Sequence, residues 1–374
     1  MNIKENENTF LKIIPIENNN NKKQIKSNLS FYYICISFIL FFILFFELII
    51  LNRNIIHTNK LLTLIQKDSK HHDINLIEPY IKAQKEFCNE QYKFINPKYE
   101  NQIFLSNAKF NEFNFSIYVF KYPNFLLEEL VKYGGFEAPI GNYMIQALQN
   151  YSLKYNIINN KDIFILDIGG NVGWYPSILG RYGYTILSFE AFERNYYVAK
   201  KNYCHLNYNS NVIIITKGLG NKEKKCQYYM HYRNEGNGMV ICDSEKSLSN
   251  KLLNGSFIKE SNVELTTLNS FMPYLSDKKI ALMKLDVEGY ELHVLEGGKE
   301  LITKYHIPFI VLEFSPTYLK EVGTEPKNLV QFLVDNGYKI SLNGFFSQNY
   351  LTIEELFAKI EFQANCYFIY NKNN

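Results

Sequence analysis

A short segment of this chain combines acidic residues with glycines at spacings that suit ligand binding. It reads DIFILDIGGNVGWYPSILG over Asp162–Gly180. The apolar run Ile163–Ile168 has the length and β-branched content of a buried parallel strand, and Asp167 lies near its end. The turn that follows contains Gly169, Gly170, Asn171 and Gly173. A strand, a glycine-rich turn and a helix start predict a nucleotide-binding corner, because bare backbone lets a ligand approach closely.

The position of the acid indicates which ligand this corner suits. A dinucleotide fingerprint has the spacing Gly-x-Gly-x-x-Gly. Here the order is Asp-x-Gly-Gly-Asn-x-Gly, with Asp167 before the turn. That carboxylate would repel a pyrophosphate and attract a ligand with a cationic end. S-adenosylmethionine, which carries an ammonium, a sulfonium and a ribose, fits this description.

A second acid follows the next apolar run. Glu190 comes directly after Thr185–Phe189, about 20 residues beyond the glycine turn, where an acidic residue binds ribose hydroxyls. Taken singly, Asp167 could be a helix-cap or turn residue, and Glu190 could be a solvated strand end. Together, with glycines between them, they predict a cofactor site.

A third acidic group follows the apolar run Ile280–Met283. Lys284, Asp286 and Glu288 alternate with apolar residues, so the period of a strand places them on one side. Ligands of open α/β sheets bind beyond the carboxyl ends of the strands, so we expect Asp286 to orient or deprotonate an acceptor there. Two alternatives stay open: a buried Lys284–Asp286 pair that only supports the strand end, and a helix cap formed by Glu288.

Three blocks of the sequence resemble FkbM-type methyltransferases, a group of class I S-adenosylmethionine-dependent enzymes. The blocks are Leu166–Trp174, Leu187–Glu193 and Leu282–Gly298, and the resemblance extends over about residues 110–370. The turn has Gly170 where alanine is common in the family, and Ala191 begins a pair that replaces the usual Glu-Pro. The resemblance implies methyl transfer to oxygen, with a glycan, lipid-linked or small-molecule hydroxyl as the acceptor.

The elements expected around these motifs alternate between strand and helix. This order predicts an α/β fold with a Rossmann-like, doubly wound, mostly parallel sheet. The expected strands are Phe113–Phe120, Ile163–Ile168, Thr185–Phe189, Val212–Thr216, Gln227–His231, Val263–Thr267, Ile280–Asp286, Phe309–Phe314, Lys339–Leu342 and Cys366–Tyr370. The expected helices are Phe125–Tyr133, Gly141–Tyr155, Trp174–Tyr182, Glu193–Leu206, Tyr290–Lys304 and Pro326–Asn336. The polar interval Gly236–Asn262 is expected to be a long mobile insertion.

Other polar residues have weaker claims to the site. Glu313 ends a strand candidate, where a site role and a loop-capping role are equally open. Glu137, after Gly-Gly-Phe, is either a lid residue or part of an ordinary turn. Glu291 and His293 are expected on a solvated helix face or in the core, and Trp174 in helix packing.

An apolar run near the N-terminus divides the chain into regions. Phe31–Leu51 is 21 residues long with one charge, Glu47. At about 1.5 Å per residue it spans ~30 Å, which predicts a single-pass transmembrane anchor. The expected regions are a disordered polar tail (1–30), the anchor (31–51), a stem or linker (52–109) and the catalytic domain (110–374). Three basic residues (Lys22, Lys23 and Lys26) lie close before the anchor and two (Arg53 and Lys60) close after it, which slightly favours a catalytic domain in the lumen of the ER or Golgi.

Composition limits the possible partners. The formal net charge is only +3, so no nucleic-acid footprint is expected. Outside the anchor, the cysteines lack metal-type clustering, so we expect no metal site. These cysteines are Cys88, Cys204, Cys226, Cys242 and Cys366, an odd number that leaves one unpaired even in an oxidising compartment.

These observations together predict a membrane-anchored, S-adenosylmethionine-dependent methyltransferase. Asp167 and the glycine turn would seat the donor, Glu190 would bind the ribose, and Asp286 with Lys284 would frame the acceptor. One alternative is a membrane-anchored glycosyltransferase, which would need a metal-binding Asp-x-Asp where this chain has Asp-Val-Glu at Asp286. The other is an inactive methyltransferase-fold scaffold, against which the intact acids argue.

Overall fold

The computed structural model describes residues 76–89, 96–121, 125–207, 211–231, 234–242 and 257–371. These residues belong to one compact unit, His71–Asn374. The predicted tail (1–30) and anchor (31–51) lie outside the described residues, as does most of the predicted stem. No helix within the described ranges is both long and apolar enough to cross a membrane.

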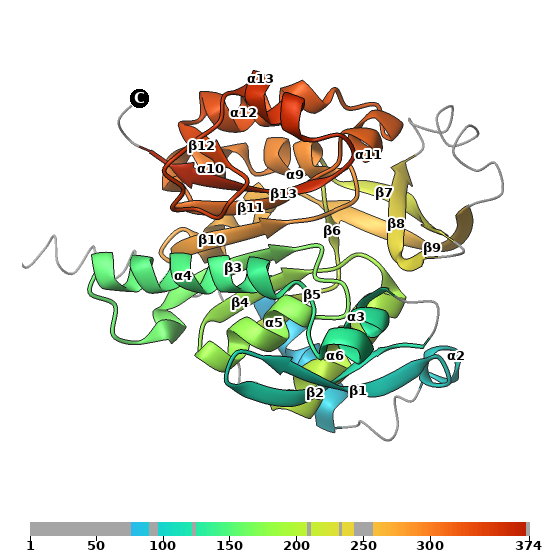
Figure 1. Ribbon diagram of the computed structural model, residues 1–374. Helices are drawn as coiled ribbons and strands as arrows, with labels where there is room; N and C mark the ends of the chain where they lie inside the picture. Colours follow the sequence, from blue (N-terminus) through green and yellow to red (C-terminus); the bar gives the residue numbers. More distant parts are fainter. Residues whose placement is uncertain are drawn as a thin grey trace, which may run out of the picture. The chain divides into compact units, whose positions relative to one another are not determined.

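A seven-stranded sheet forms the centre of this unit (Figure 1). Its strands are β3 (Ile163–Ile168), β4 (Thr185–Phe189), β5 (Val212–Ile215), β10 (Lys279–Leu285), β11 (Phe309–Phe314), β12 (Tyr338–Ser341) and β13 (Ala364–Tyr370). The order across the sheet is β12-β13-β11-β10-β3-β4-β5, and β10, β11, β3, β4 and β5 pair in parallel. β13 is antiparallel to both of its neighbours. The predicted α/β fold with a mostly parallel sheet is therefore confirmed.

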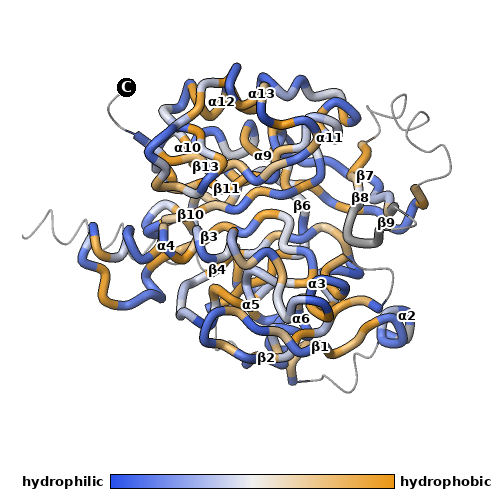
Figure 2. The backbone as a smooth tube through the Cα atoms, in the orientation of Figure 1, coloured by the Kyte–Doolittle hydropathy of each residue, from blue (hydrophilic) through white to orange (hydrophobic). Residues whose placement is uncertain are grey.

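Helices cover both faces of this sheet (Figure 1). On one face lie α4 (Ala138–Lys154), α5 (Trp174–Leu179) and α6 (Glu193–Leu206). On the other lie α9 (Glu291–Gly297), α10 (Lys299–Tyr305), α11 (Pro316–Glu321), α12 (Pro326–Asp335) and α13 (Ile353–Lys359). Each face has its own apolar core, because alternate residues of a strand point to opposite sides: Ile165 belongs to one core and Leu166 to the other. Figure 2 shows the outer helices alternating between hydrophilic and hydrophobic residues, as amphipathic helices do.

The strand order changes direction beside β3. The chain runs outward from β3 through β4 to β5, then returns to β10 on the other side of β3. Ligands of open α/β sheets bind at such a switch point, beyond the carboxyl ends of the strands. Here those ends carry Asp167 on β3 and Lys284 on β10, which are direct neighbours in the pairing.

Two smaller sheets flank the central one. The hairpin of β1 (Ile103–Phe110) and β2 (Phe113–Phe120) packs on α6, where the Asn202 amide bonds both backbone groups of Tyr118. The second sheet has the order β6-β9-β7-β8, from β6 (Gly218–Leu219), β7 (Lys224–His231), β8 (Asn234–Cys242) and β9 (Phe257–Thr266). Three further α-helices belong to the described residues: α2 (Pro97–Glu100), α3 (Phe125–Tyr133) and α8 (Met272–Leu275).

The prediction of a mobile insertion over Gly236–Asn262 is wrong at both ends of that range. β8 occupies its start and β9 its end, while residues 243–256 lie outside the description. A disulfide between Cys226 and Cys242 joins β7 to β8, and the Tyr228 ring stacks on Phe192 with centroids 3.9 Å apart. These contacts stabilise β8, whose sequence begins with polar residues and two glycines, so hydrophobic periodicity could not reveal it.

One predicted helix is divided. The range Tyr290–Lys304 was expected to form a single helix, but α9 ends at Gly297 and α10 begins at Lys299. A Cβ at Gly297 would lie 1.9 Å from the carbonyl oxygen of Gly220, and one at Gly298 would lie 2.9 Å from Leu268. At this break the helix backbone therefore lies directly against the backbone at Gly220, which follows β6.

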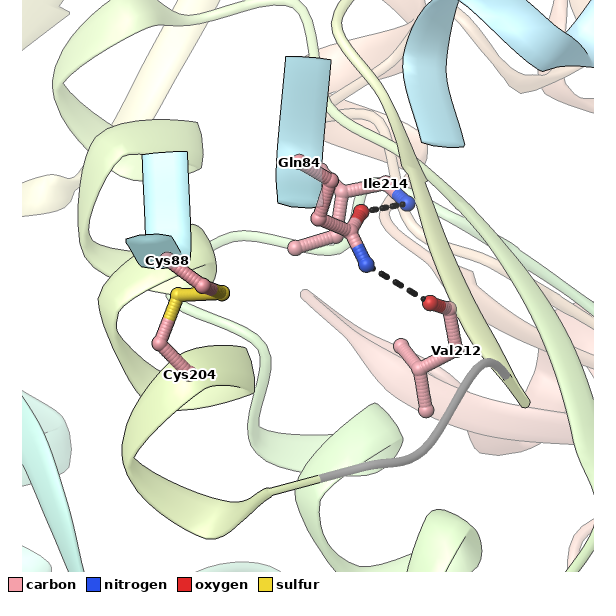
Figure 3. The surroundings of a disulfide bond; sticks show 5 residues. All are labelled: Gln84, Cys88, Cys204, Val212 and Ile214. Carbon is pink, nitrogen blue, oxygen red and sulfur yellow. Dashed lines mark hydrogen bonds between the residues drawn. A yellow bond between two sulfur atoms is a disulfide. The ribbon is translucent and has the colours of Figure 1, made fainter. Parts of the chain in front are cut away.

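A helix over 76–89 fastens the N-terminal end of the described chain to the unit (Figure 3). The Gln84 side chain donates to the Val212 carbonyl (2.9 Å) and accepts from the Ile214 amide (3.0 Å) on β5. One turn further on, Cys88 forms a disulfide with Cys204 of α6. These contacts cover the edge of the central sheet, since β5 is its last strand.

Candidate active site

The glycine turn after β3 lies directly against the end of β10. Gly169 has φ +82°, and a Cβ there would lie 1.7 Å from the Asp286 carbonyl oxygen. The Asp286 amide in turn donates to the Ile168 carbonyl (3.0 Å). Only glycine permits this approach, so the turn fixes the β10 end where the third acidic group begins.

Asp167 lies beneath this turn and is buried. The Ser188 hydroxyl donates to its Oδ2 (2.7 Å), while Oδ1 has no hydrogen-bond partner among the described residues. Burial raises the pKa of Asp167, and the charge of Lys284 opposes that rise. Asp167 does not line either cavity described below, so it supports the turn from behind. Gly173 also lies outside both cavities. It faces Ala199 and is the N-cap residue of α5, with φ +85°.

Glu190 connects the glycine turn to the loop after β4. Its Oε2 accepts from the Asn171 amide (2.7 Å), and its Oε1 accepts from the Phe192 amide (2.9 Å). Burial raises the pKa of Glu190 to about 7, although the two hydrogen bonds favour the ionised carboxylate and lower the pKa. Glu190 therefore contacts the glycine turn directly, through the Asn171 amide, while its role as a ribose ligand stays a prediction.

Lys284 and Asp286 form the ion pair that their spacing predicts. Lys284 Nζ donates to Asp286 Oδ2 (2.8 Å) and to the Gly169 carbonyl oxygen (3.1 Å). The lysine side chain is 10% exposed and the aspartate 29%. Burial favours the neutral form of each group, but their attraction prevails: the pKa of Lys284 is raised and that of Asp286 is lowered.

Two glutamates join Asp286 in a cluster of carboxyl groups. One oxygen each of Asp286, Glu288 and Glu313 lies within 4.8 Å of the others, a spacing that could hold a cation. Burial, together with the charges of Asp286 and Glu288, raises the pKa of Glu313 to about 11. Burial and Asp286 also raise the pKa of Glu288 well above its ordinary value. At neutral pH the cluster therefore holds protons as well as charge, and Glu313 hydrogen-bonds to Asp286.

The turn after β10 differs from its expected form. The strand ends at Leu285, and Glu288 has the left-handed φ of 52°. Glu288 does not cap α9, whose N-cap residue is Tyr290 and makes no side-chain capping bond. Glu291 instead ties the preceding turn to the helix: its Oε1 accepts from the Val287 amide (3.2 Å) and the Gly289 amide (3.0 Å). Glu291 is 2% exposed, so the expected solvated face is wrong at this position. Burial raises its pKa to about 7.

Two cavities meet at the glycine turn. The first cavity lies towards β4 and the second sheet and contains Glu190, Asn195 and Tyr228. The second cavity lies towards α5 and β11 and contains Glu137, Trp174, Lys284, Glu313 and Gln363. The residues common to both are Gly169, Asn171, Asp286 and Glu288.

The two cavities differ in size. The first is about 100 Å³, narrowed where Tyr228 lies against Gly238: a Cβ on this glycine would be 1.8 Å from the tyrosine oxygen. The second is about 400 Å³, within the range of small-molecule sites. A ligand that passes over the glycine turn would therefore reach from a narrow chamber into a wide one.

Several residues of the cavities were not placed there by sequence reasoning. Tyr175 donates to Glu137 Oε2 at 2.5 Å in the second cavity. Buried Trp174 lines the same cavity, and its indole N–H has no hydrogen-bond partner among the described residues. Asn195 brings a similarly unpaired Oδ1 to the first cavity. Glu137 and Glu313 gave a weak signal, an acid after a glycine pair and an acid at a strand end, whereas Trp174 and Asn195 gave none.

Comparisons with known proteins agree with the sequence blocks. Residues 167–340 match the model of the methyltransferase FkbM domain. "Methyltransferase 1" of Beauveria bassiana (strain ARSEF 2860) is 27% identical over 146 residues, which cover 36% of this chain and 58% of that protein. The chain thus matches little more than half the length of this curated relative.

Solved structures show more distant likeness. Magnesium protoporphyrin IX methyltransferase from Synechocystis PCC 6803 is 13% identical, with a TM-score of 0.31 over 62% of this chain and 81% of that one. The bifunctional kinase-methyltransferase WbdD is 13% identical, with a TM-score of 0.36 over 66% of this chain and 43% of that one. The family match is the stronger finding: the similarity to the FkbM methyltransferase domain extends from Asp167 at the end of β3 to Ile340 in β12.

Proposed function

We propose that this protein transfers a methyl group from S-adenosylmethionine to a hydroxyl oxygen. The observation that carries the proposal is the junction of two cavities over Gly169 and Asn171, with acidic residues in each. The donor is a nucleoside with a cationic tail, so it suits a cleft that bends over a glycine turn and is lined by carboxylates. A pyrophosphate-containing ligand would face the same carboxylates unfavourably.

The nucleoside end of the donor would occupy the first cavity. Glu190 would bind the ribose hydroxyls, and its bonds to Asn171 and Phe192 already fix the carboxylate. The unpaired Oδ1 of Asn195 offers a further acceptor there. Tyr228 narrows this chamber, so we propose that its ring shifts as the nucleoside enters.

The methyl group would pass between the cavities, next to Asp286. The acceptor oxygen attacks the methyl carbon, the carbon–sulfur bond breaks with its electron pair on sulfur, and the hydroxyl proton leaves to a carboxylate or to water. Lys284 keeps Asp286 ionised and fixed in direction, so Asp286 would orient the acceptor hydroxyl as a hydrogen-bond acceptor. Glu288, also common to both cavities, would complete the frame around the acceptor.

We further propose that the enzyme is anchored in an endomembrane, with its catalytic domain in the lumen and a glycan or lipid-linked hydroxyl as acceptor. The apolar run Phe31–Leu51 supports the anchor. The Cys88–Cys204 and Cys226–Cys242 disulfides support an oxidising compartment. The acceptor class comes from the family resemblance together with the anchor.

Calorimetric titration of the full chain in detergent tests the proposed donor. We expect binding of S-adenosylmethionine, and none of NAD or a uridine-diphosphate sugar at the same concentration. Binding of the nucleotide sugar instead would favour the glycosyltransferase alternative. Failure to bind any of the three would leave the scaffold alternative.

A further inference from the structure

Glu137 occupies a backbone conformation that its own helix does not require. It precedes α4 as the N-cap residue with φ 44° and ψ 39°, a left-handed conformation that is strained for a non-glycine residue. Its side chain makes no capping hydrogen bond to α4, although that bond is the usual reason for a polar N-cap residue. Strain of this kind persists where the surrounding structure imposes it, often at a ligand site.

The turn before Glu137 is built to hold it in place. A Cβ at Gly135 would lie 2.8 Å from the Lys109 carbonyl oxygen, and the Lys109 amide donates to the Gly134 carbonyl (2.6 Å). β1 thus clamps the two glycines, and Glu137 follows two residues later. The amides of Ile140 and Gly141 both donate to the Glu137 carbonyl oxygen, which fixes the backbone from the other side.

The carboxylate of Glu137 lies in the second cavity and is only partly engaged. Tyr175 donates to Oε2, and no cationic side chain of the described residues lies within 4.0 Å of the carboxylate. Lys284 is paired with Asp286 and lies over the Tyr175 ring, 5.3 Å from its centroid. Burial raises the pKa of Glu137, and the Tyr175 hydrogen bond and the Lys284 charge oppose the rise. The carboxylate therefore lacks a close cation in a cavity that contains three further carboxyl groups.

We infer that Glu137 binds the ammonium group of the methyl donor, a contact that rests on the proposed function. Glu190 and Glu137 lie in different cavities, and the glycine turn lies between them. A donor whose ribose is at Glu190 directs its amino-acid end across Gly169 and Asn171 into the second cavity. The ammonium and the donor's own carboxylate share the carbon atom at the end remote from the ribose. Of these two groups the ammonium is the one that a carboxylate attracts, so it turns to the acid on the far side of the turn and forms a charge-assisted hydrogen bond.

Three ligands separate this contact from the rest of the donor site. S-adenosylmethionine carries both cations, S-adenosylhomocysteine keeps the ammonium without the sulfonium, and 5′-methylthioadenosine has neither. The affinity of the full chain in detergent for each ligand is measured by calorimetry, in the wild type and in Glu137→Gln. The exposed Glu128→Gln on α3 is the matched control, because it removes the same charge outside both cavities.

The expected result is a selective loss. Glu137→Gln should weaken S-adenosylmethionine and S-adenosylhomocysteine roughly ten- to a hundredfold, as for a lost hydrogen bond to a charged group, and leave 5′-methylthioadenosine within about twofold. Glu128→Gln should leave all three unchanged. Tyr175→Phe, which keeps the carboxylate and removes its positioning bond, should cause a smaller loss with the same selectivity.

Three outcomes would overturn the inference. An equal loss for all three ligands would assign Glu137 a structural role, and unchanged affinities would exclude the contact. A loss for S-adenosylmethionine alone would place the acid at the sulfonium and also contradict the inference. If the wild type binds none of the ligands, the proposed function itself fails, which is a different result from any of these.

Discussion

Lys284 is the only cationic residue among the described residues that line the second cavity. It neutralises Asp286 at 2.8 Å and bonds the Gly169 carbonyl, so it joins the acid cluster to the glycine turn. Spacing in the sequence predicts the Lys284–Asp286 pair, because two residues along a strand return to the same face. Spacing could not predict Glu313, which belongs to a neighbouring strand and reaches the cluster only through sheet pairing.

Removal of this cation should destabilise the fold. Lys284→Met leaves Asp286 without its partner, and breaking a mostly buried pair costs about 3 kcal/mol. Urea unfolding of Lys284→Met and of the double variant Lys284→Met/Asp286→Asn measures the effect. The double variant should recover part of the loss, because the uncompensated charge is gone. A double variant less stable than the single one would contradict this explanation.

Asp286 should matter more for turnover than for donor binding. Asp286→Asn keeps a hydrogen-bonding side chain of the same size but loses the charge that Lys284 fixes. We expect slower methyl transfer to the acceptors in a membrane extract, by about a hundredfold, with the affinity for S-adenosylmethionine changed severalfold at most. Activity equal to the wild type would remove Asp286 from the proposed chemistry.

Glu291 should make stability depend on pH. Its pKa rises from the ordinary 4.5 to about 7 in the folded protein because it is buried. Between these values the folded state binds more protons than the unfolded state, so stability falls as pH rises, by up to about 1.4 kcal/mol per pH unit. Unfolding from pH 5 to 7 should therefore show a steeper fall for the wild type than for Glu291→Gln. Parallel profiles would contradict the assignment.

The acid cluster allows a direct test of the expectation that no metal takes part. Asp286, Glu288 and Glu313 have the spacing of a cation site, yet Lys284 already supplies a positive charge beside them. We expect donor affinity and activity to be unchanged after dialysis against EDTA. A loss that Mg²⁺ or Mn²⁺ restores would show that a metal ion belongs to this site.

At the scale of elements, the two adjacent glycines of the turn, Gly169 and Gly170, should differ in how well they tolerate a side chain. A Cβ at Gly169 would meet the Asp286 backbone, which cannot move without distorting β10, whereas one at Gly170 would meet the Ser188 hydroxyl at 2.1 Å. The hydroxyl can rotate away, although it then gives up its hydrogen bond to the Asp167 carboxylate. Gly169→Ala should abolish donor binding or folding, and Gly170→Ala should retain donor affinity within about threefold. Equal effects in thermal unfolding and calorimetry would refute the distinction.

The two disulfides should affect different properties. Cys226–Cys242 joins the strands that carry Tyr228 and Val240 into the first cavity, whereas Cys88–Cys204 fastens the helix over 76–89. Their sequence separations of 16 and 116 residues predict about 3 and ~4.7 kcal/mol of stabilisation. The double serine variant at Cys226 and Cys242 should therefore weaken donor binding more, and that at Cys88 and Cys204 should lower the unfolding temperature more. The reverse pattern would contradict a role for β7 and β8 in the donor cavity.

Elements with strong hydrophobic periodicity could be predicted from the sequence to the residue. Ile163–Ile168, Thr185–Phe189, Phe309–Phe314 and Glu193–Leu206 have the bounds that their patterns predict. β1 and β8 were missed for a physical reason. β1 lies outside the central sheet and exposes Phe104 and Leu105, so its pattern does not alternate cleanly. The short strand β6 depends on its pairing with β9, a contact that the local sequence does not determine.

At the scale of the whole molecule, the two disulfides bear on the proposed compartment. Cys88–Cys204 and Cys226–Cys242 are of a kind that forms and persists in oxidising environments, which supports the proposal of a luminal catalytic domain. The Asn-x-Ser sequon at Asn114 lies exposed on β2, so whether it is glycosylated would test the same proposal. In intact microsomes we expect protease protection of the catalytic domain and a mobility shift with endoglycosidase at Asn114. Digestion of the domain from the cytosolic side would place it on the opposite face.

The most direct test of the account is a crystal structure of the chain with S-adenosylhomocysteine. We expect the ligand to cross the glycine turn at Gly169 and Asn171, with its ribose hydroxyls on Glu190 and its sulfur next to Asp286. A ligand bound away from this turn, or one whose ribose has no contact with Glu190, would contradict it.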